Sequence, residues 1–303
     1  MIIGAVLCFS VQFVFIKCYQ RERGANIFST LIMVVIYSAL FVPMYFIIGG
    51  FKFEFTWYSL LIACLLAIDG IICDIFGIKV LSVANLSVYS IFLMLGGMLV
   101  PFVYGLIFFG ERLTVFRGLA VLFTIVALLS TFKKGEDKKK VTSRVVFYLI
   151  MIFLTNGLGG TLIYIHQKSA YEVVSTSGFL LLSGLNRFVL AGIIVICMSV
   201  AKNINTKKQP EQLNEIVIGK KSLIKSWAIS IAAVFGFALM QGTAQFLSAS
   251  AAKYIDAGVQ STIVSGGCIF MSAIFGLFFK EKITVKTIIC LIFALASVIF
   301  MIL

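Results

Sequence analysis

Long apolar runs, separated by short polar connectors, constrain the fold of this chain more than any other feature. A helix needs about 20 predominantly apolar residues to cross the hydrocarbon core of a bilayer, where it satisfies its own backbone hydrogen bonds. Of the 303 residues, 61% are hydrophobic and 12% charged, too little polar material to cover a soluble protein of this size. The sequence therefore predicts an all-α integral membrane protein with ten transmembrane helices. Their apolar runs cover residues 2–17, 28–48, 57–78, 86–109, 114–132, 145–165, 176–200, 226–248, 259–279 and 284–303.

The net charge of +13 comes mainly from Lys and Arg in the connectors, which favours membrane topology over a nucleic-acid partner. Counted with their flanking residues, the odd-numbered connectors carry 19 Lys and Arg, and the even-numbered ones carry 5. The positive-inside rule then places the odd-numbered connectors in the cytoplasm and both termini outside the cell membrane. The first run begins at Met1 without a basic leader or a small-residue cleavage site, so we expect a retained helix and not a signal peptide.

A basic polar linker divides the chain into two units of five apolar runs each. This linker, "KKGEDKKKVTSR" at residues 133–144, follows a first unit, 1–132, and precedes a second unit, 145–303, which contains a further polar loop at 201–225. Because each unit has an odd number of runs, the second must enter the membrane from the side opposite to the first. The division therefore predicts two inverted five-helix repeats.

A duplicated phrase supports this repeat. Residues 108–115 read "FFGERLTV", and residues 278–285 read "FFKEKITV", an offset of 170. The same offset aligns the Gly pair 96–97 with the Gly pair 266–267, and Phe123 with Phe293. One shift without gaps thus aligns a helix, a turn and a second helix.

These features resemble those of the drug/metabolite transporter superfamily, EamA type. In both halves a Gly-containing helix is followed by Phe-Phe, an acidic-basic turn ("GERLT", "KEKIT") and a last plain apolar helix. The resemblance covers essentially the whole chain and implies a transporter of small solutes with a central cavity between the halves. It leaves the substrate open, among amino acids, metabolites and toxic compounds. Members of the family usually have both termini in the cytoplasm, which is opposite to the orientation that the connector charges predict.

Three charged residues lie well inside the apolar runs: Asp69, Asp74 and Arg187. A charge at the bilayer centre is costly and requires a partner or a water-filled cavity. Five residues of helix turn the two carboxylates about 140° apart, so we expect that they do not both point at one small site. Asp69 is the candidate for a cavity residue that exchanges a proton, and Asp74 lies closer to Lys79 at the connector. The alternative is a structural ion pair between an aspartate and Arg187.

A second group of candidates is neutral. By the resemblance, the first, third, fourth, sixth, eighth and ninth helices surround the path, and amides and hydroxyls on them would hydrogen-bond a polar solute. The alternative is that these groups bond neighbouring helices to one another, at about 0.6 kcal/mol each. The candidates are Gln12, Asn85, Tyr89, Ser90, Asn156, Tyr164, Gln241, Gln245, Gln260 and Ser265.

Glycine clusters provide candidate hinges. "NGLGG" at 156–160 and "GGMLVP" at 96–101 are expected to interrupt otherwise regular helices. The ring of Pro101 crowds the carbonyl of Gly97, which predicts a kink. Close helix packing through small residues is the alternative. The hinge candidates are Gly96, Gly97, Pro101, Gly157 and Gly160.

The duplicated turns themselves are predicted to be structural. Glu111 and Glu281 are expected to cap or tether them, and Thr114 and Thr284 stand where helix N-caps would be. The helices that follow, 114–132 and 284–303, have no charged residue beyond their first turns and are predicted to be a lipid-facing scaffold.

These observations favour a carrier that moves a small organic solute by alternating access, with the bilayer and the solute as its partners and proton coupling through Asp69 as one possibility. A passive channel or facilitator is the alternative. An enzyme is disfavoured because the sequence has no HExxH motif and no serine with a histidine nearby. Seven cysteines without a CxxC motif, and His166 as the one histidine, predict no metal and no cofactor. We expect His166 to be a surface residue. The sequence leaves monomer and homodimer open.

Overall fold

Each apolar run of the sequence forms one α-helix. The computed structural model describes residues 1–108, 114–132, 143–206, 220–251, 254, 257–278 and 285–302. Within these residues ten helices follow one another: α1 (Ile2–Arg23), α2 (Ile27–Ile48), α3 (Trp57–Val83), α4 (Leu86–Phe108), α5 (Val115–Phe132), α6 (Ser143–Gln167), α7 (Thr176–Thr206), α8 (Lys220–Ala251), α9 (Ala257–Phe278) and α10 (Val285–Ile302). The all-helical prediction is confirmed. Several helices extend beyond their apolar runs into the polar connectors.

Short polar side chains begin several helices. The side chain of Asn26 accepts a hydrogen bond from the backbone of Phe28 at the start of α2, and Thr56 does the same for Ser59 at the start of α3. Thr114 accepts from the backbone N–H of Arg117 at 3.2 Å, which confirms the N-cap expected before α5. The other residues proposed for the duplicated turns, Glu111, Glu281 and Thr284, lie outside the described residues.

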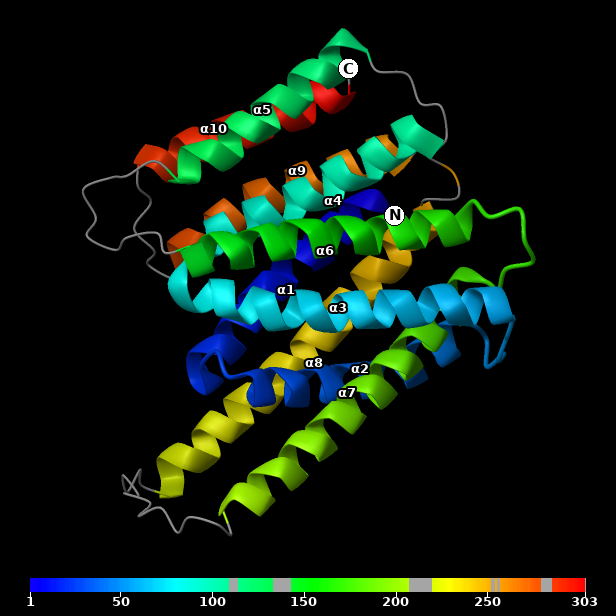
Figure 1. The fold of residues 1–303 in the computed structure, drawn as a ribbon, viewed down its shortest axis with the longest axis vertical. Coiled ribbons are helices and arrows are strands. Elements are labelled where there is room, and N and C mark those ends of the chain that lie inside the picture. Colours follow the sequence, from blue (N-terminus) through cyan, green and yellow to red (C-terminus); the bar gives the residue numbers. More distant parts are fainter. Residues whose placement is uncertain are drawn as a thin grey trace.

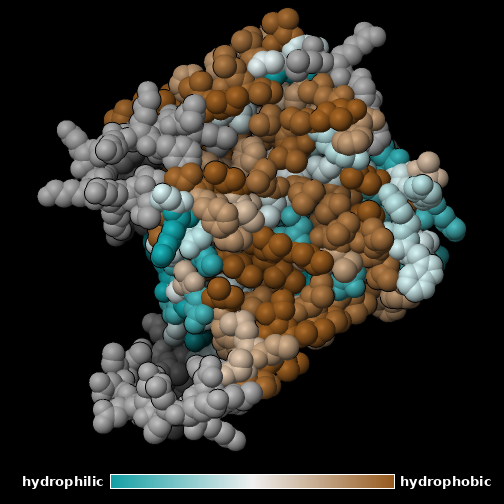
Figure 2. Space-filling model, in the orientation of Figure 1, coloured by the Kyte–Doolittle hydropathy of each residue, from teal (hydrophilic) through white to brown (hydrophobic). Residues whose placement is uncertain are grey.

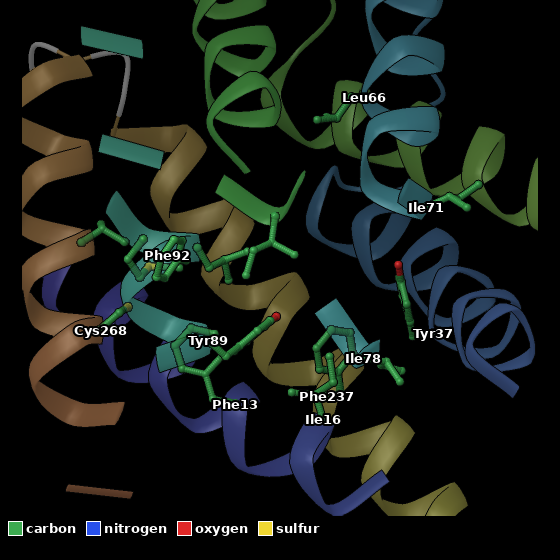
Figure 3. Close-up of a cluster of buried hydrophobic side chains, with 14 of the residues drawn as sticks. Phe13, Ile16, Tyr37, Leu66, Ile71, Ile78, Tyr89, Phe92, Phe237 and Cys268 are labelled. Atoms are coloured by element: carbon green, nitrogen blue, oxygen red, sulfur yellow. The ribbon is translucent and has the colours of Figure 1, made fainter. Parts of the chain in front are cut away.

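The helices form a stack of contacting pairs (Figure 1). α5 packs on α10 at one end of the long axis, α4 packs on α9 next to them, and α2 packs on α7 toward the opposite end. Between these pairs, α1 packs on α8 and α3 packs on α6. The buried apolar cluster runs through this middle region and includes Phe13, Tyr37, Tyr89 and Phe237 (Figure 3).

The face of the molecule drawn in Figure 2 is apolar over much of its described area. Large apolar side chains are exposed at helical spacing, for example Leu61, Leu65 and Ile68 on α3. A surface of this kind is stable against lipid and would aggregate in water. By length and composition, seven of the described helices, α1, α2, α3, α4, α6, α7 and α8, can each cross a membrane. Shorter apolar segments lie at Val115–Ala127, Gln260–Gly276 and Leu291–Met301.

The glycine clusters do not interrupt their helices, which corrects the sequence-based expectation of breaks. α4 runs from Leu86 to Phe108 through Pro101, and α6 is helical through residues 156–160. The glycines instead bring α4 and α6 together. A Cβ atom on Gly96 would lie 2.0 Å from the carbonyl oxygen of Phe153, and one on Gly157 would lie 2.6 Å from the carbonyl oxygen of Gly96. The interface therefore requires glycine at these positions.

Candidate functional site

A cavity of about 210 Å³ lies among the helices of the two halves. Its lining comes from α1, α3, α4, α6, α8 and α9, the six helices that the family resemblance places around the path, and from Arg187 of α7. Among the described residues, α5 and α10 contribute nothing to this lining. Most of the residues singled out in the sequence border it: Gln12, Asp69, Asp74, Tyr89, Asn156, Tyr164, Arg187, Gln241, Gln245, Gln260, Ser265, Gly97, Pro101 and Gly160.

Four of the sequence candidates, Asn85, Ser90, Gly96 and Gly157, lie away from the cavity lining. Gly96 and Gly157 face the α4–α6 interface described above. Asn85 precedes α4, where its carbonyl accepts a hydrogen bond from the backbone of Tyr89 at 3.0 Å. Its place at the start of the helix accounts for a polar residue there, independently of any solute.

Arg187 and Asp74 are joined through a tyrosine that the sequence reasoning missed. Nη1 of Arg187 donates to the hydroxyl of Tyr37 at 3.0 Å, and this hydroxyl donates to Oδ2 of Asp74. Figure 3 shows the hydroxyl of Tyr37 directed from α2 toward α3. Nη2 of Arg187 also lies 3.4 Å from the carbonyl oxygen of Leu66. The direct ion pair, which was the alternative in the sequence analysis, is thus replaced by a chain of hydrogen bonds across α7, α2 and α3.

Asp69 differs from Asp74 because its carboxylate has no such partner. It borders the cavity near the middle of the 27-residue helix α3 and is 7% exposed. Within the described residues it forms no hydrogen bond or ion pair. Its Oδ2 atom lies against α6, where a Cβ atom on Gly159 would be 2.9 Å away. Glycine at that position leaves room for the carboxylate.

The two aspartates border one cavity, which the angular reasoning did not anticipate. Their side chains nevertheless diverge, because Asp74 contacts Tyr37 of α2 and Asp69 lies against Gly159 of α6. The cavity is wide enough to be bordered by both. Lys79, which the sequence places near Asp74, lies over the rings of Phe76 and Tyr148 at 5.3 and 5.2 Å.

Some polar candidates bond neighbouring helices. Nδ2 of Asn156 on α6 donates to the carbonyl oxygen of Leu93 on α4 at 2.7 Å. Nε2 of Gln260 on α9 donates to the carbonyl oxygen and the hydroxyl of Ser248 on α8 at 2.6 and 2.7 Å. The Ser265 hydroxyl donates to the carbonyl oxygen of Met94 at 2.9 Å, and the hydroxyls of Ser90 and Ser272 bond to each other. These groups hold the frame of the cavity together.

Two amides are different. The Oε1 atoms of Gln12 on α1 and Gln241 on α8 are buried and accept no hydrogen bond within the described part of the chain. Gln12 is 5% exposed, and both side chains border the cavity. Because an acceptor without a partner is costly away from water, these oxygens are available to a donor group on a bound molecule or water.

The single histidine is buried, which corrects its assignment to the surface. His166 has no exposed area, its Nε2 atom lies 2.9 Å from the Ser59 hydroxyl, and its ring stacks on Phe179 at 3.8 Å. The apolar run ends at 165, but α6 continues to Gln167 and packs against α3. The contact between His166 and Ser59 corrects the expectation that no serine lies near the histidine, but both residues are buried outside the cavity lining, where they join α3 and α6. No group of three or more His, Cys, Asp or Glu side chains suited to a metal ion is found among the described residues.

Comparisons with known proteins agree with this architecture. The EamA-like transporter family matches residues 147–303, more than half of the chain. A crystal structure of another protein aligns over 99% of this chain and 94% of its own, with a TM-score of 0.62 and 12% sequence identity, a likeness that shows the fold alone. A search of curated proteins finds no match. With the family match covering the second half and the apolar helices covering the whole, the chain belongs to the EamA-like transporter family.

Proposed function

We propose that this protein is a secondary transporter that carries a small organic solute through the membrane by alternating access. The observation that carries the proposal is the cavity, which is bordered near mid-helix by Gln12, Asp69 and Arg187 and receives side chains from both halves of the chain. Carriers of related design bind their solutes near the bilayer midplane between two repeats.

The pairing of helices supports ten spans in two inverted repeats. In such a repeat each helix of the first half corresponds to the helix numbered five higher in the second half, so that α1 corresponds to α6 and α3 to α8. The pair α1–α8 then corresponds to α6–α3, the pair α4–α6 to α9–α1, and the pair α3–α7 to α8–α2. The two helices of every one of these pairs are in contact. The pairs α2–α7, α4–α9 and α5–α10 correspond to themselves. This is the pattern expected of a two-fold axis that relates the halves.

Residues that match at the offset of 170 occupy corresponding places. Phe123 of α5 and Phe293 of α10 contact each other, with ring centroids 5.9 Å apart, as two copies beside a two-fold axis would. A Cβ atom on Gly97 would meet Asn156 of α6 at 2.5 Å, and one on Gly267 would meet Val6 of α1 at 2.5 Å. Each glycine thus faces the first helix of the opposite half.

Proton coupling through Asp69 is part of the proposal. Its carboxylate has no hydrogen-bond partner within the described residues and can bind a proton in one state of the cycle and release it in the other. The other titratable or charged groups that border the cavity are Asp74 and Cys73 of α3, Arg187 of α7, Tyr89 of α4 and Tyr164 of α6. Asp74 and Arg187 are already bonded to Tyr37, which leaves Asp69 as the carboxylate suited to exchange.

A transport assay tests the proposal. A thermal-shift screen of the purified protein against amino acids, nucleosides, sugars and cationic dyes would identify a ligand class for counterflow in proteoliposomes. A carrier gives saturable uptake that is accelerated by unlabelled ligand inside. Flux that neither saturates nor shows counterflow would favour the passive channel instead. For coupling, we expect Asp69→Asn to abolish uptake driven by a pH gradient; unchanged pH dependence would refute the role of Asp69.

The orientation can be tested separately. The connector charges support cytoplasmic odd-numbered connectors in the cell membrane, with both termini outside. A cysteine introduced near Lys138, in a background without the native cysteines, should then resist an impermeant thiol reagent added to intact cells. Labelling of that cysteine from outside would reverse the topology.

A further inference from the structure

The charges around the cavity do not balance. Its charged lining residues among the described part of the chain are Asp69, Asp74 and Arg187. Arg187 and Asp74 share Tyr37, and the guanidinium lies so close to α3 that a Cβ atom on Gly70 would be 1.9 Å from Nη2. Asp69 remains without a hydrogen bond or ion pair to the described residues. The unmatched charge is therefore negative and lies at Asp69.

The unmatched hydrogen-bonding groups point in the same direction. The buried Oε1 atoms of Gln12 and Gln241 accept no hydrogen bond from the described residues. Carboxylate and amide oxygens both accept from N–H donors. Nε of Arg187 is also buried without a partner, but Arg187 as a whole is only 6% exposed and its guanidinium is held between Tyr37, Leu66 and Gly70. Apart from Nε of Arg187, the buried lining atoms without a partner among the described residues are thus acceptors.

The rest of the lining is aromatic and aliphatic. Phe9, Phe13, Tyr89, Tyr164 and Phe237 border the cavity. Figure 3 shows the rings of Phe13 and Tyr89 together, and their centroids are 5.8 Å apart in an edge-to-face arrangement. The faces of aromatic rings attract cations, and they bind organic ammonium ions better than strongly hydrated metal ions. Such walls also suit the apolar part of an organic molecule.

We propose that the cavity binds a small organic ammonium ion, with its N–H groups on Asp69 and on the amide oxygens of Gln12 and Gln241, and its apolar part against the aromatic rings. The inference rests on the proposed transport function and names its substrate class. The volume of the cavity limits the size of the ligand. A cavity of about 150 Å³ holds benzene, so the cavity of about 210 Å³ suits one ring with a short amine-bearing chain.

A series of ligands of the same shape tests the charge. Phenethylammonium, 2-phenylethanol and phenylacetate would be titrated into the full-length protein in lipid nanodiscs by isothermal calorimetry, with phenylalanine as the zwitterion. We expect phenethylammonium to bind at least about tenfold more tightly than the other three, because it alone pairs with Asp69 without bringing a negative charge near it. Equal or tighter binding of any of these three, or no binding of phenethylammonium, would overturn the inference.

Variants assign the effect to particular atoms. Asp69→Asn keeps the shape and removes the charge, and should reduce the preference for phenethylammonium over 2-phenylethanol by about tenfold or more. Gln12→Leu should reduce this preference by a smaller factor than Asp69→Asn does. The matched control is Glu172→Gln, an exposed carboxylate outside the cavity, which should leave the preference unchanged. If Asp69→Asn fails to fold, the ligand series on the unmodified protein and on Gln12→Leu still decides; an unchanged preference in Asp69→Asn contradicts the assignment.

Proteoliposome counterflow separates the two proposals. Tight binding of phenethylammonium without flux or counterflow of this ion would refute transport and leave the ammonium site standing. Saturable counterflow of another solute by a protein that does not bind phenethylammonium would refute the substrate class and leave transport standing.

Discussion

Gly96→Ala should destabilise this protein, although alanine is the better helix former. The ideal Cβ atom would lie 2.0, 2.6 and 2.8 Å from the O, C and Cα atoms of Phe153, whereas ordinary contact begins near 3.4 Å. All three are backbone atoms, so α4 and α6 must separate by roughly 1 Å, since packed interiors leave no free volume for the methyl group. Overpacking of this kind costs about 3 kcal/mol, and the gain in helix propensity returns about 1 kcal/mol. The net expected loss is about 2 kcal/mol of unfolding free energy.

The assay is reversible unfolding in mixed micelles of SDS and a mild detergent, followed by circular dichroism. Gly192→Ala is the matched control, because no atom lies within 4 Å of its ideal Cβ position in α7. That variant should be neutral or up to about 1 kcal/mol more stable than the unmodified protein. The close approach of α4 and α6 would be disproved by a Gly96→Ala protein as stable as the control.

Three further substitutions test the bonds that frame the cavity and begin a helix, each by the same unfolding measurement. Tyr37→Phe removes the hydroxyl between Arg187 and Asp74, leaves buried charged groups unsatisfied, and should cost about 1–3 kcal/mol. A cost near zero would show that water replaces the hydroxyl. Thr114→Ala removes the N-cap of α5 and should cost about 1 kcal/mol, whereas Thr114→Ser should retain most of the stability. Gln260→Leu loses its bonds from α9 to Ser248 on α8, at about 0.6 kcal/mol each, and should be milder than Tyr37→Phe; a larger loss than Tyr37→Phe would mean that this link dominates.

The positions of the helices were predictable because a bilayer imposes one length on every span. Each apolar run became a helix, and α2 and α4 begin and end within one residue of their runs. Other helices are several residues longer than their runs: α1 continues through Arg23 and α8 begins at Lys220. The apolar run measures what lipid can cover, whereas a helix continues into water wherever its backbone remains hydrogen-bonded.

The types of residue that line the cavity were predictable from the sequence, but their hydrogen-bond partners were not. Polar residues inside spans are rare, so Asp69, Asp74 and Arg187 stand out in the sequence. Tyr37 does not, because a tyrosine within an apolar helix is common and only the neighbouring helices decide whether its hydroxyl faces a charge. The prediction for His166 was wrong for the same reason. Its place near the end of α6 suggests contact with water, but packing against Phe179 buries the side chain.

The sequence left two interpretations of the glycine clusters, hinges or close helix packing, and the structure supports close packing. α4 and α6 remain helical through their glycine clusters, although Pro101 lies inside α4 and cannot donate to the carbonyl oxygen of Gly97. The close backbone contacts of Gly96 and Gly157 favour the packing alternative, and the hinge role of these glycines stays a prediction.

The polar groups around the cavity divide according to whether the protein already satisfies them. Asn156, Gln260 and the Tyr37-linked pair are bonded to other helices, so a solute that recruited them would first have to break the frame. Asp69 and the oxygens of Gln12 and Gln241 have no such bond to the described residues, and a solute can gain their full interaction. Because binding favours groups that are preorganised and still unsatisfied, recognition should reside in this second set. This set contains a carboxylate and two buried acceptor oxygens, which is why the selectivity of the proposed carrier is expected to follow the charge of the solute more than its shape.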